Sequence, residues 1–100
     1  MSLVSLGSLL YLVGGQTTQT DSYDPQTGAW RQLARALEGR LEAGAVVLGA
    51  CIYLTGGYSC SRGDYLRSVE RYHPQRDFWE EVGNLPQPSR SHGCLCLYTD

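Results

Sequence analysis

Short apolar runs separated by glycines and polar turns recur along this chain, and this pattern predicts β-strands. In the second half, Gly49-Ala50 is a short link that predicts an antiparallel hairpin, and the turn at 73–77 contains Pro74, which ends strand pairing. The strands predicted in this half cover residues 43–48, 51–55, 68–72 and 78–82. Together they predict a four-stranded antiparallel unit.

The first half repeats this pattern with a shorter start. Gly7-Ser8 is its first turn, and residues 24–28 form the turn that contains Pro25. Its predicted strands cover residues 3–6, 9–13, 20–23 and 29–33. A last strand-like stretch at 91–98 resembles another first strand. The pattern therefore predicts an all-β fold built of modules that are not stable alone.

Two marks recur in the same order in both halves. Each predicted second strand ends in a glycine doublet, at Gly14-Gly15 and Gly56-Gly57. Each third strand ends in a tyrosine that precedes a tryptophan by seven residues, as in Tyr72 and Trp79. A repeat of about 40 to 50 residues with glycine and aromatic marks is typical of β-propeller blades.

The two copies differ in the stretch between the doublet and the tyrosine. It has 7 residues in the first copy (16–22) and 14 in the second (58–71). Repeat proteins place such insertions on one face, which is often the binding face. The longer loop contains a set of side chains typical of protein interfaces. They include Tyr58, Arg62, Asp64 and Tyr65.

These residues resemble the kelch repeat. The first copy contributes Tyr11-Leu12-Val13-Gly14-Gly15, Tyr23-Asp24-Pro25 and Trp30, and the second contributes Tyr53-Leu54-Thr55-Gly56-Gly57, Tyr72-His73-Pro74 and Trp79. His73 replaces the usual aspartate, which puts one turn-capping hydrogen bond in doubt. The resemblance divides the chain into repeats at 1–37 and 38–86 and the start of a further repeat at 87–100.

The resemblance implies a partial β-propeller, with about two four-stranded blades and the first strand of a third. Kelch propellers have five to seven blades, most often six, so we expect this chain to be a fragment with unpaired edges and apolar blade faces. The tyrosines and tryptophans are expected to be buried between blades, each with one polar contact. These roles are structural.

In kelch propellers of this kind, partner peptides bind at one mouth. By position, the mouth residues after the doublets are Gln16 and Tyr58, and those before the first strands are Leu41 and Arg90. With Ser91 and His92, Arg90 fits an acidic peptide through its guanidinium, although bonding to loop carbonyls is an equally good interpretation. Arg40 is predicted to be structural.

Composition excludes several function classes. The net charge of −2 argues against general nucleic-acid binding, and the apolar runs are too short to span a membrane. All eight basic residues are arginine, which suits protein recognition but also fits a plain composition bias. Without a secretory signal, a cytoplasmic location is expected. The cysteines match no zinc pattern and are predicted to be structural, except for Cys60 in its polar loop.

No pattern for catalysis is present, so we predict no enzyme activity, no catalytic residue, no metal and no cofactor. The leading hypothesis is a protein-interaction module. The resemblance to the kelch-like family implies part of the substrate-recognition propeller of a cullin-RING ubiquitin ligase adaptor, whose cullin contact lies in an upstream BTB and BACK region absent from these residues. Actin or cytoskeletal binding is the second hypothesis, and an inactive, unstable truncated isoform is the third.

Overall fold

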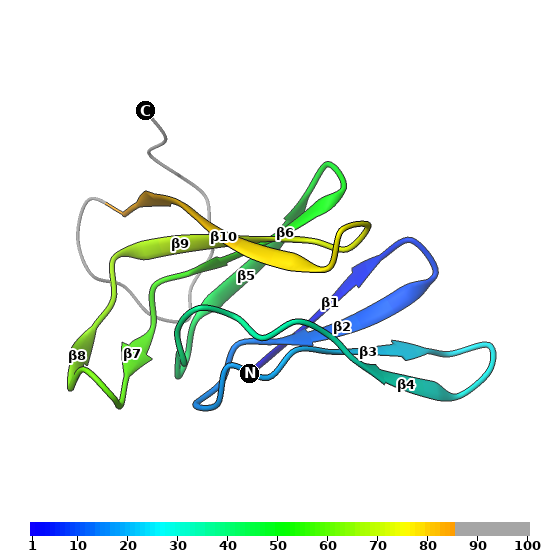
Figure 1. The fold of residues 1–100 in the computed structure, drawn as a ribbon, viewed down its shortest axis with the longest axis horizontal. Coiled ribbons are helices and arrows are strands. Elements are labelled where there is room, and N and C mark those ends of the chain that lie inside the picture. The colour runs from blue at the N-terminus through cyan, green and yellow to red at the C-terminus, as the bar shows by residue number, and fades with distance from the viewer. Residues whose placement is uncertain (86–100) are drawn as a thin grey trace.

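A computed structural model describes residues 1–85 and shows two four-stranded antiparallel sheets (Figure 1). The first sheet, called blade 1, has its strands in chain order. They are β1 (Ser2–Leu6), β2 (Leu9–Val13), β3 (Asp21–Asp24) and β4 (Ala29–Gln32). The predicted all-β fold is confirmed. The strand predicted at 91–98 and the further repeat at 87–100 lie outside the described residues.

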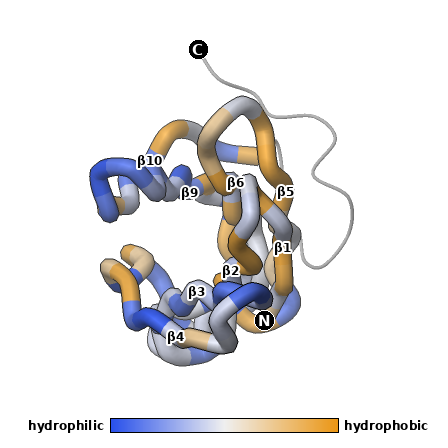
Figure 2. Tube along the Cα trace, turned by 90° about the vertical axis from the view of Figure 1, so that its right-hand side faces the viewer, coloured by the Kyte–Doolittle hydropathy of each residue, from blue (hydrophilic) through white to orange (hydrophobic). Residues whose placement is uncertain are grey.

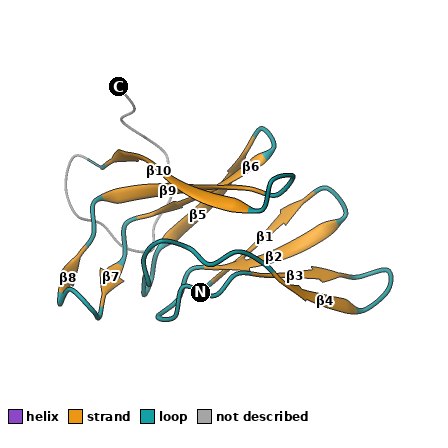
Figure 3. Ribbon diagram, viewed as in Figure 1, coloured by secondary structure: helices purple, strands orange, loops and turns teal. Residues whose placement is uncertain are grey.

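The second sheet, called blade 2, repeats this order, with a small two-stranded sheet inserted between its second and third strands. Blade 2 consists of β5 (Gly44–Leu48), β6 (Cys51–Thr55), β9 (Ser68–His73) and β10 (Phe78–Asn84), and the inserted sheet consists of β7 (Tyr58–Ser59) and β8 (Asp64–Tyr65). The sequence pattern predicted only a polar loop at β7 and β8, because two-residue strands leave no periodic signal (Figure 3).

The turns between third and fourth strands show how two different residues meet one backbone requirement. Gly28 ends this turn in blade 1 with a φ of 74°, and Asp77 ends it in blade 2 with a φ of 54°. Glycine adopts this left-handed conformation without strain, and aspartate is one of the few other residues that tolerate it. In both turns this residue donates its backbone N–H to the carbonyl of the turn's first residue at 2.7 Å.

The replaced aspartate changes the turn as predicted. In blade 1, the Asp24 carboxylate accepts a hydrogen bond from the backbone N–H of Gln26 at 2.9 Å. In blade 2, the His73 side chain instead contacts Cys51 and Glu80. The second turn therefore has no side-chain cap from this position, and the His73 ring lies against the sheet instead.

The two blades lie closest at their first strands. β1 and β5 are side by side, and the sheets diverge toward β4 and β10, as neighbouring blades of a propeller do (Figure 2). Residues 33–43 connect the blades. They cross from the outer strand of blade 1 to the inner strand of blade 2.

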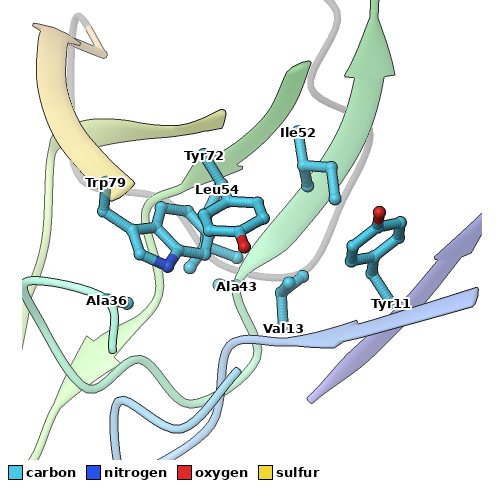
Figure 4. Packing of buried hydrophobic residues seen from close by; sticks show 8 residues of the cluster. All are labelled: Tyr11, Val13, Ala36, Ala43, Ile52, Leu54, Tyr72 and Trp79. Carbon is cyan, nitrogen blue, oxygen red and sulfur yellow. The ribbon is translucent and has the colours of Figure 1, made fainter. Parts of the chain in front are cut away.

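The hydrophobic core lies between the blades (Figure 4). Side chains of alternate positions on the facing sheets meet there, because successive strand residues point to opposite faces. Tyr11 and Tyr72 have ring centroids 6.3 Å apart across the interface, and Tyr72 packs on Trp79 at 5.1 Å. The core cluster consists of Tyr11, Val13, Ala36, Ala43, Ile52, Leu54, Tyr72 and Trp79.

The expected burial of both tryptophans holds only for the second copy. Trp79 is 6% exposed because its indole packs against the connecting segment of blade 1, whereas Trp30 is 59% exposed. Trp30 packs against Tyr23, with ring centroids 4.7 Å apart and ring planes at 44°, on the face of blade 1 that is directed away from blade 2. Within residues 1–85 no second sheet covers that face, so the prediction for Trp30 is wrong in this structure.

Candidate protein-interaction surface

The connecting segment joins the two loops that follow the glycine doublets. Gly15 and Arg40 exchange two backbone hydrogen bonds, of 2.7 and 2.5 Å. Leu41 and Tyr58 exchange two more, both of 2.9 Å. This segment therefore pairs with both loops through two isolated β-bridges, at the end of the blades where β7 and β8 lie (Figure 1).

The buried Arg40 side chain anchors this segment to blade 2. It is fully buried and its Nε donates to Glu70 Oε2 at 3.0 Å. Its other donors bond to the Gly56 carbonyl, at 2.8 Å, and to the carbonyl and hydroxyl of Ser68, at 2.8 and 2.7 Å. The prediction that Arg40 is structural is confirmed.

Glu70 completes the buried network. Its carboxylate also accepts the backbone N–H groups of Leu37, at 2.7 Å, and Glu38, at 3.2 Å. A buried ion pair needs such additional partners, because desolvation alone costs several kcal/mol per ion. The network thus fixes the connecting segment to β9 and sets the position of Leu41 on the surface.

Glycines allow the close approach of these chains. A Cβ at Gly57 would lie 2.8 Å from the Leu41 carbonyl oxygen, and its φ is 91°. A Cβ at Gly39 would lie 2.1 Å from the Gln16 carbonyl oxygen. The second glycine of the second doublet thus permits the close approach of the connecting segment.

The inserted hairpin presents two tyrosines as a pair. β7 and β8 place Tyr58 opposite Tyr65, with ring centroids 5.1 Å apart and ring planes at 74°. The buried Ser59 stabilises the turn, because its Oγ accepts the N–H of Arg62 at 3.2 Å and its carbonyl accepts that of Gly63 at 2.8 Å. Tyr65 remains 39% exposed.

A groove of about 570 Å³ lies beside the hairpin, between the connecting segment and the ends of β9 and β10. Arg62 closes one side through a salt bridge to Glu38, with an Nη2 to Oε1 distance of 2.5 Å. The wall carries both charges and apolar surface, and Leu37 is 55% exposed. Such a mixed lining suits a polypeptide that offers both charged and apolar side chains.

The structure brings together five of the predicted site residues. Leu41 and Tyr58 are paired, and Arg62, Asp64 and Tyr65 line the groove. Gln16 is exposed next to Gly15, on the blade 1 side of the connecting segment, and does not line the groove. The remaining candidates, Arg90, Ser91 and His92, lie outside the described residues.

Sequence reasoning missed part of the groove wall. The missed residues come from the connecting segment, from the position before β9 and from the middle of β10, and none of them belongs to a repeat motif. They include Leu37, Glu38, Arg67 and Glu81. The stretches 16–22 and 58–71 between doublet and tyrosine differ in length, but nothing in the pattern showed that the connecting segment would lie against the longer one.

Comparisons with known proteins agree with this architecture. The family described as Kelch motif matches residues 39–86. The chain is built of kelch repeats. It is 58% identical over 89 residues to human kelch-like protein 23, and this alignment covers 89% of this chain and 16% of that protein. It is 36% identical over 98 residues to human kelch-like protein 38, covering 94% of this chain and 17% of that protein.

A solved structure supports the same fold for these kelch repeats. The structure of YjhT aligns with a TM-score of 0.79 at 22% identity, covering 88% of this chain and 28% of that one. At this identity the likeness concerns the fold alone. The chain thus spans about a sixth of the length of its curated kelch-like relatives and is a partial propeller. Within residues 1–85 no helix is long and apolar enough to cross a membrane.

Proposed function

We propose that these kelch repeats bind a protein partner through the surface formed by Leu41, Tyr58, Arg62, Asp64 and Tyr65. The tyrosine pair on the inserted hairpin carries this proposal. Tyr65 lines the groove and packs edge-on against Tyr58, and backbone hydrogen bonds between Tyr58 and Leu41 tie the hairpin to the connecting segment. Tyrosine is one of the residue types that dominate the binding energy of protein interfaces.

The finer proposal is a role in substrate recognition for a cullin-RING ubiquitin ligase in the cytoplasm. It is supported by the similarity to kelch-like proteins 23 and 38. The resemblance to the kelch-like family implies that a separate BTB and BACK region makes the cullin contact. These residues would then supply substrate-binding surface and none of the cullin-binding surface.

Affinity capture tests the binding surface. The chain is immobilised and incubated with cell lysate, and captured proteins are quantified for the wild type and for Tyr58→Ala/Tyr65→Ala. We expect the tyrosine variant to lose at least about 90% of a specific set of partners, since a hot-spot residue contributes about 2 kcal/mol or more. The matched control is Thr27→Ala/Gln75→Ala, two exposed turn residues at the opposite end of the blades. Equal capture by both variants would overturn the proposed surface.

A reconstituted ubiquitination reaction tests the adaptor role. With cullin, RING protein, charged conjugating enzyme and a captured partner, we expect no transfer when this chain is the only adaptor. We expect transfer when the same repeats are joined to a BTB and BACK region, and its loss in the tyrosine variant. Ubiquitin transfer supported by the 100 residues alone would contradict the division of roles.

A further inference from the structure

The face of blade 2 directed away from blade 1 carries a cysteine, a histidine and a glutamate in contact. Ile52 of β6 pairs with Tyr72 of β9, and both face the core. Their chain neighbours Cys51 and His73 therefore lie next to each other on the opposite face. Glu80 of β10 follows Trp79 and points to this same face.

The distances are those of a relay between the three side chains. Cys51 Sγ lies 3.4 Å from His73 Nδ1, and His73 Nε2 lies 2.6 Å from Glu80 Oε2. A carboxylate bonded to one ring nitrogen fixes the histidine tautomer, with the proton on Nε2. Nδ1 is then an acceptor directed at the thiol, which is the arrangement that activates a nucleophile.

The surroundings hold this relay in place. The contact with His73 and the two hydrogen bonds from Arg71 keep the pKa of Glu80 below its usual value, so the carboxylate is ionised at neutral pH. The ring of His73 stacks on Phe78, with centroids 4.6 Å apart and planes at 13°. The imidazole therefore has little freedom to turn away from Cys51.

A small cavity gives access to the thiol. Its volume is about 80 Å³, and Cys51, His73 and Arg76 are among the residues that line it. Cys51 is half-buried and lines this cavity, outside the apolar core between the blades.

The equivalent positions of blade 1 show how far a neighbouring blade buries this part of a sheet. Leu9 and Asp24 occupy there the places of Cys51 and His73, on the face that blade 2 covers. Both remain only half-buried, and Arg31, in the place of Glu80, remains exposed. Covering by a neighbouring blade therefore leaves this end of the face accessible.

We propose that Cys51 is a covalent modification site for small α,β-unsaturated carbonyl compounds, with His73 as the base. The thiol proton passes to His73 Nδ1, and the thiolate sulfur forms a bond to the β-carbon of the double bond. The electron pair of that double bond moves to the carbonyl as an enolate. The enolate then takes the proton from the imidazolium at its α-carbon, which leaves a thioether and a neutral histidine. No redox partner is required.

Cys60 provides an internal reference in the same chain. It is exposed in the hairpin loop, whereas His73, the histidine of residues 1–85, contacts Cys51. Exposure alone predicts faster modification of Cys60. Activation by the relay predicts the reverse order.

The test is a competition with limiting N-ethylmaleimide at pH 7, quenched in time and read by peptide mass spectrometry. The measured quantity is the ratio of the Cys51 rate to the Cys60 rate, in buffer and in 8 M urea. We expect the ratio in buffer to exceed the ratio in urea about tenfold, a conservative value for general-base assistance. A ratio in buffer at or below the urea value would overturn the proposal.

His73→Asp is the matched variant, because blade 1 has Asp24 at this place with an intact turn. Its carboxylate removes the base and repels the thiolate, so the ratio in buffer should fall below the urea value. Unfolding of the variant would only bring the ratio to the urea value. Glu80→Gln should give an intermediate ratio, because it keeps His73 as the base but removes the carboxylate that orients the imidazole. A wild-type ratio in His73→Asp would also overturn the proposal.

Discussion

The indole Nε1 of Trp79 donates to Thr20 Oγ1 at 3.2 Å, across the interface between the two blades. The same N–H is 3.1 Å from the Ala34 carbonyl oxygen. A tryptophan of blade 2 is thereby tied both to the third strand region of blade 1 and to the connecting segment. The position that marks the repeat in sequence is also the position that joins one repeat to the preceding one.

This relationship predicts different costs for the same substitution in the two repeats. Trp79→Phe removes the buried N–H and part of the core volume, and we expect a loss of about 2 kcal/mol in the free energy of unfolding. Trp30→Phe, on the exposed face of blade 1, should cost less than about 0.5 kcal/mol. Urea unfolding followed by circular dichroism measures both. Equal losses would show that the two tryptophans have equivalent surroundings, contrary to the structure.

The buried Arg40–Glu70 pair predicts a second contrast. Glu70→Gln leaves the fully buried guanidinium without its counter-charge, and breaking such a pair costs about 3–5 kcal/mol. Arg62→Met breaks the exposed pair with Glu38 and should cost about 1 kcal/mol or less. Thermal unfolding of the two variants gives the comparison. A mild effect of Glu70→Gln would mean that the network does not anchor the connecting segment.

We predict that substituting the second glycine of the doublet at 56–57 lowers the free energy of unfolding by more than its backbone conformation alone explains. Gly49→Ala meets no atom within 4 Å, so only its φ of 60° opposes the change, at about 1–2 kcal/mol. Gly57→Ala is also opposed by a positive φ, of 91°, and in addition places its Cβ 2.8 Å from the Leu41 carbonyl oxygen. We expect a clearly lower unfolding midpoint in urea for Gly57→Ala. Coincident unfolding curves would contradict the close approach of these two chains.

Asp77 predicts a specific loss of stability in acid. Its carboxylate accepts the Tyr72 hydroxyl at 2.6 Å and the Ala34 N–H at 2.9 Å, and these bonds hold its pKa below the usual value. A carboxyl with a lowered folded-state pKa stabilises the fold above its unfolded pKa of about 3.9, and this contribution is lost as pH falls through the folded value.

Asp77→Asn keeps the acceptor oxygen and tolerates the left-handed backbone, but it does not titrate. We therefore expect a smaller loss of stability below about pH 4 in this variant than in the wild type. Part of the loss will remain, because Glu80 also has a lowered pKa. Equal losses in both proteins, measured by urea unfolding at a series of pH values, would contradict the role of Asp77.

The strands of both blades could be predicted from local pattern, because alternation and turn residues act within a few positions. β6 covers the predicted residues 51–55, and β10 runs only two residues past its predicted end. The structural role of Arg40 could also be predicted from the sequence, because its position in the repeat differs from that of the mouth residues. The repeat boundaries at 37 and 86 stay predictions.

Features that depend on contacts between distant segments could not be predicted in this way. Trp30 and Trp79 have the same local sequence mark, and only the neighbouring blade makes one buried and the other exposed. The lining of the groove by Leu37 and the contact of Cys51 with His73 likewise require the register between strands. A single sequence contains those pairings only implicitly, because long-range partners are chosen by packing.

Site-specific photo-crosslinking tests the proposed binding surface most directly. A benzophenone amino acid is placed at Tyr65 beside the groove or, as the control, at Gln75 in the turn at the opposite end of the blades. After irradiation in cells, the account predicts discrete protein adducts from position 65 that disappear with Tyr58→Ala. It predicts no corresponding adducts from position 75. The same adducts from both positions, or none from position 65, would contradict a protein-binding role for this surface.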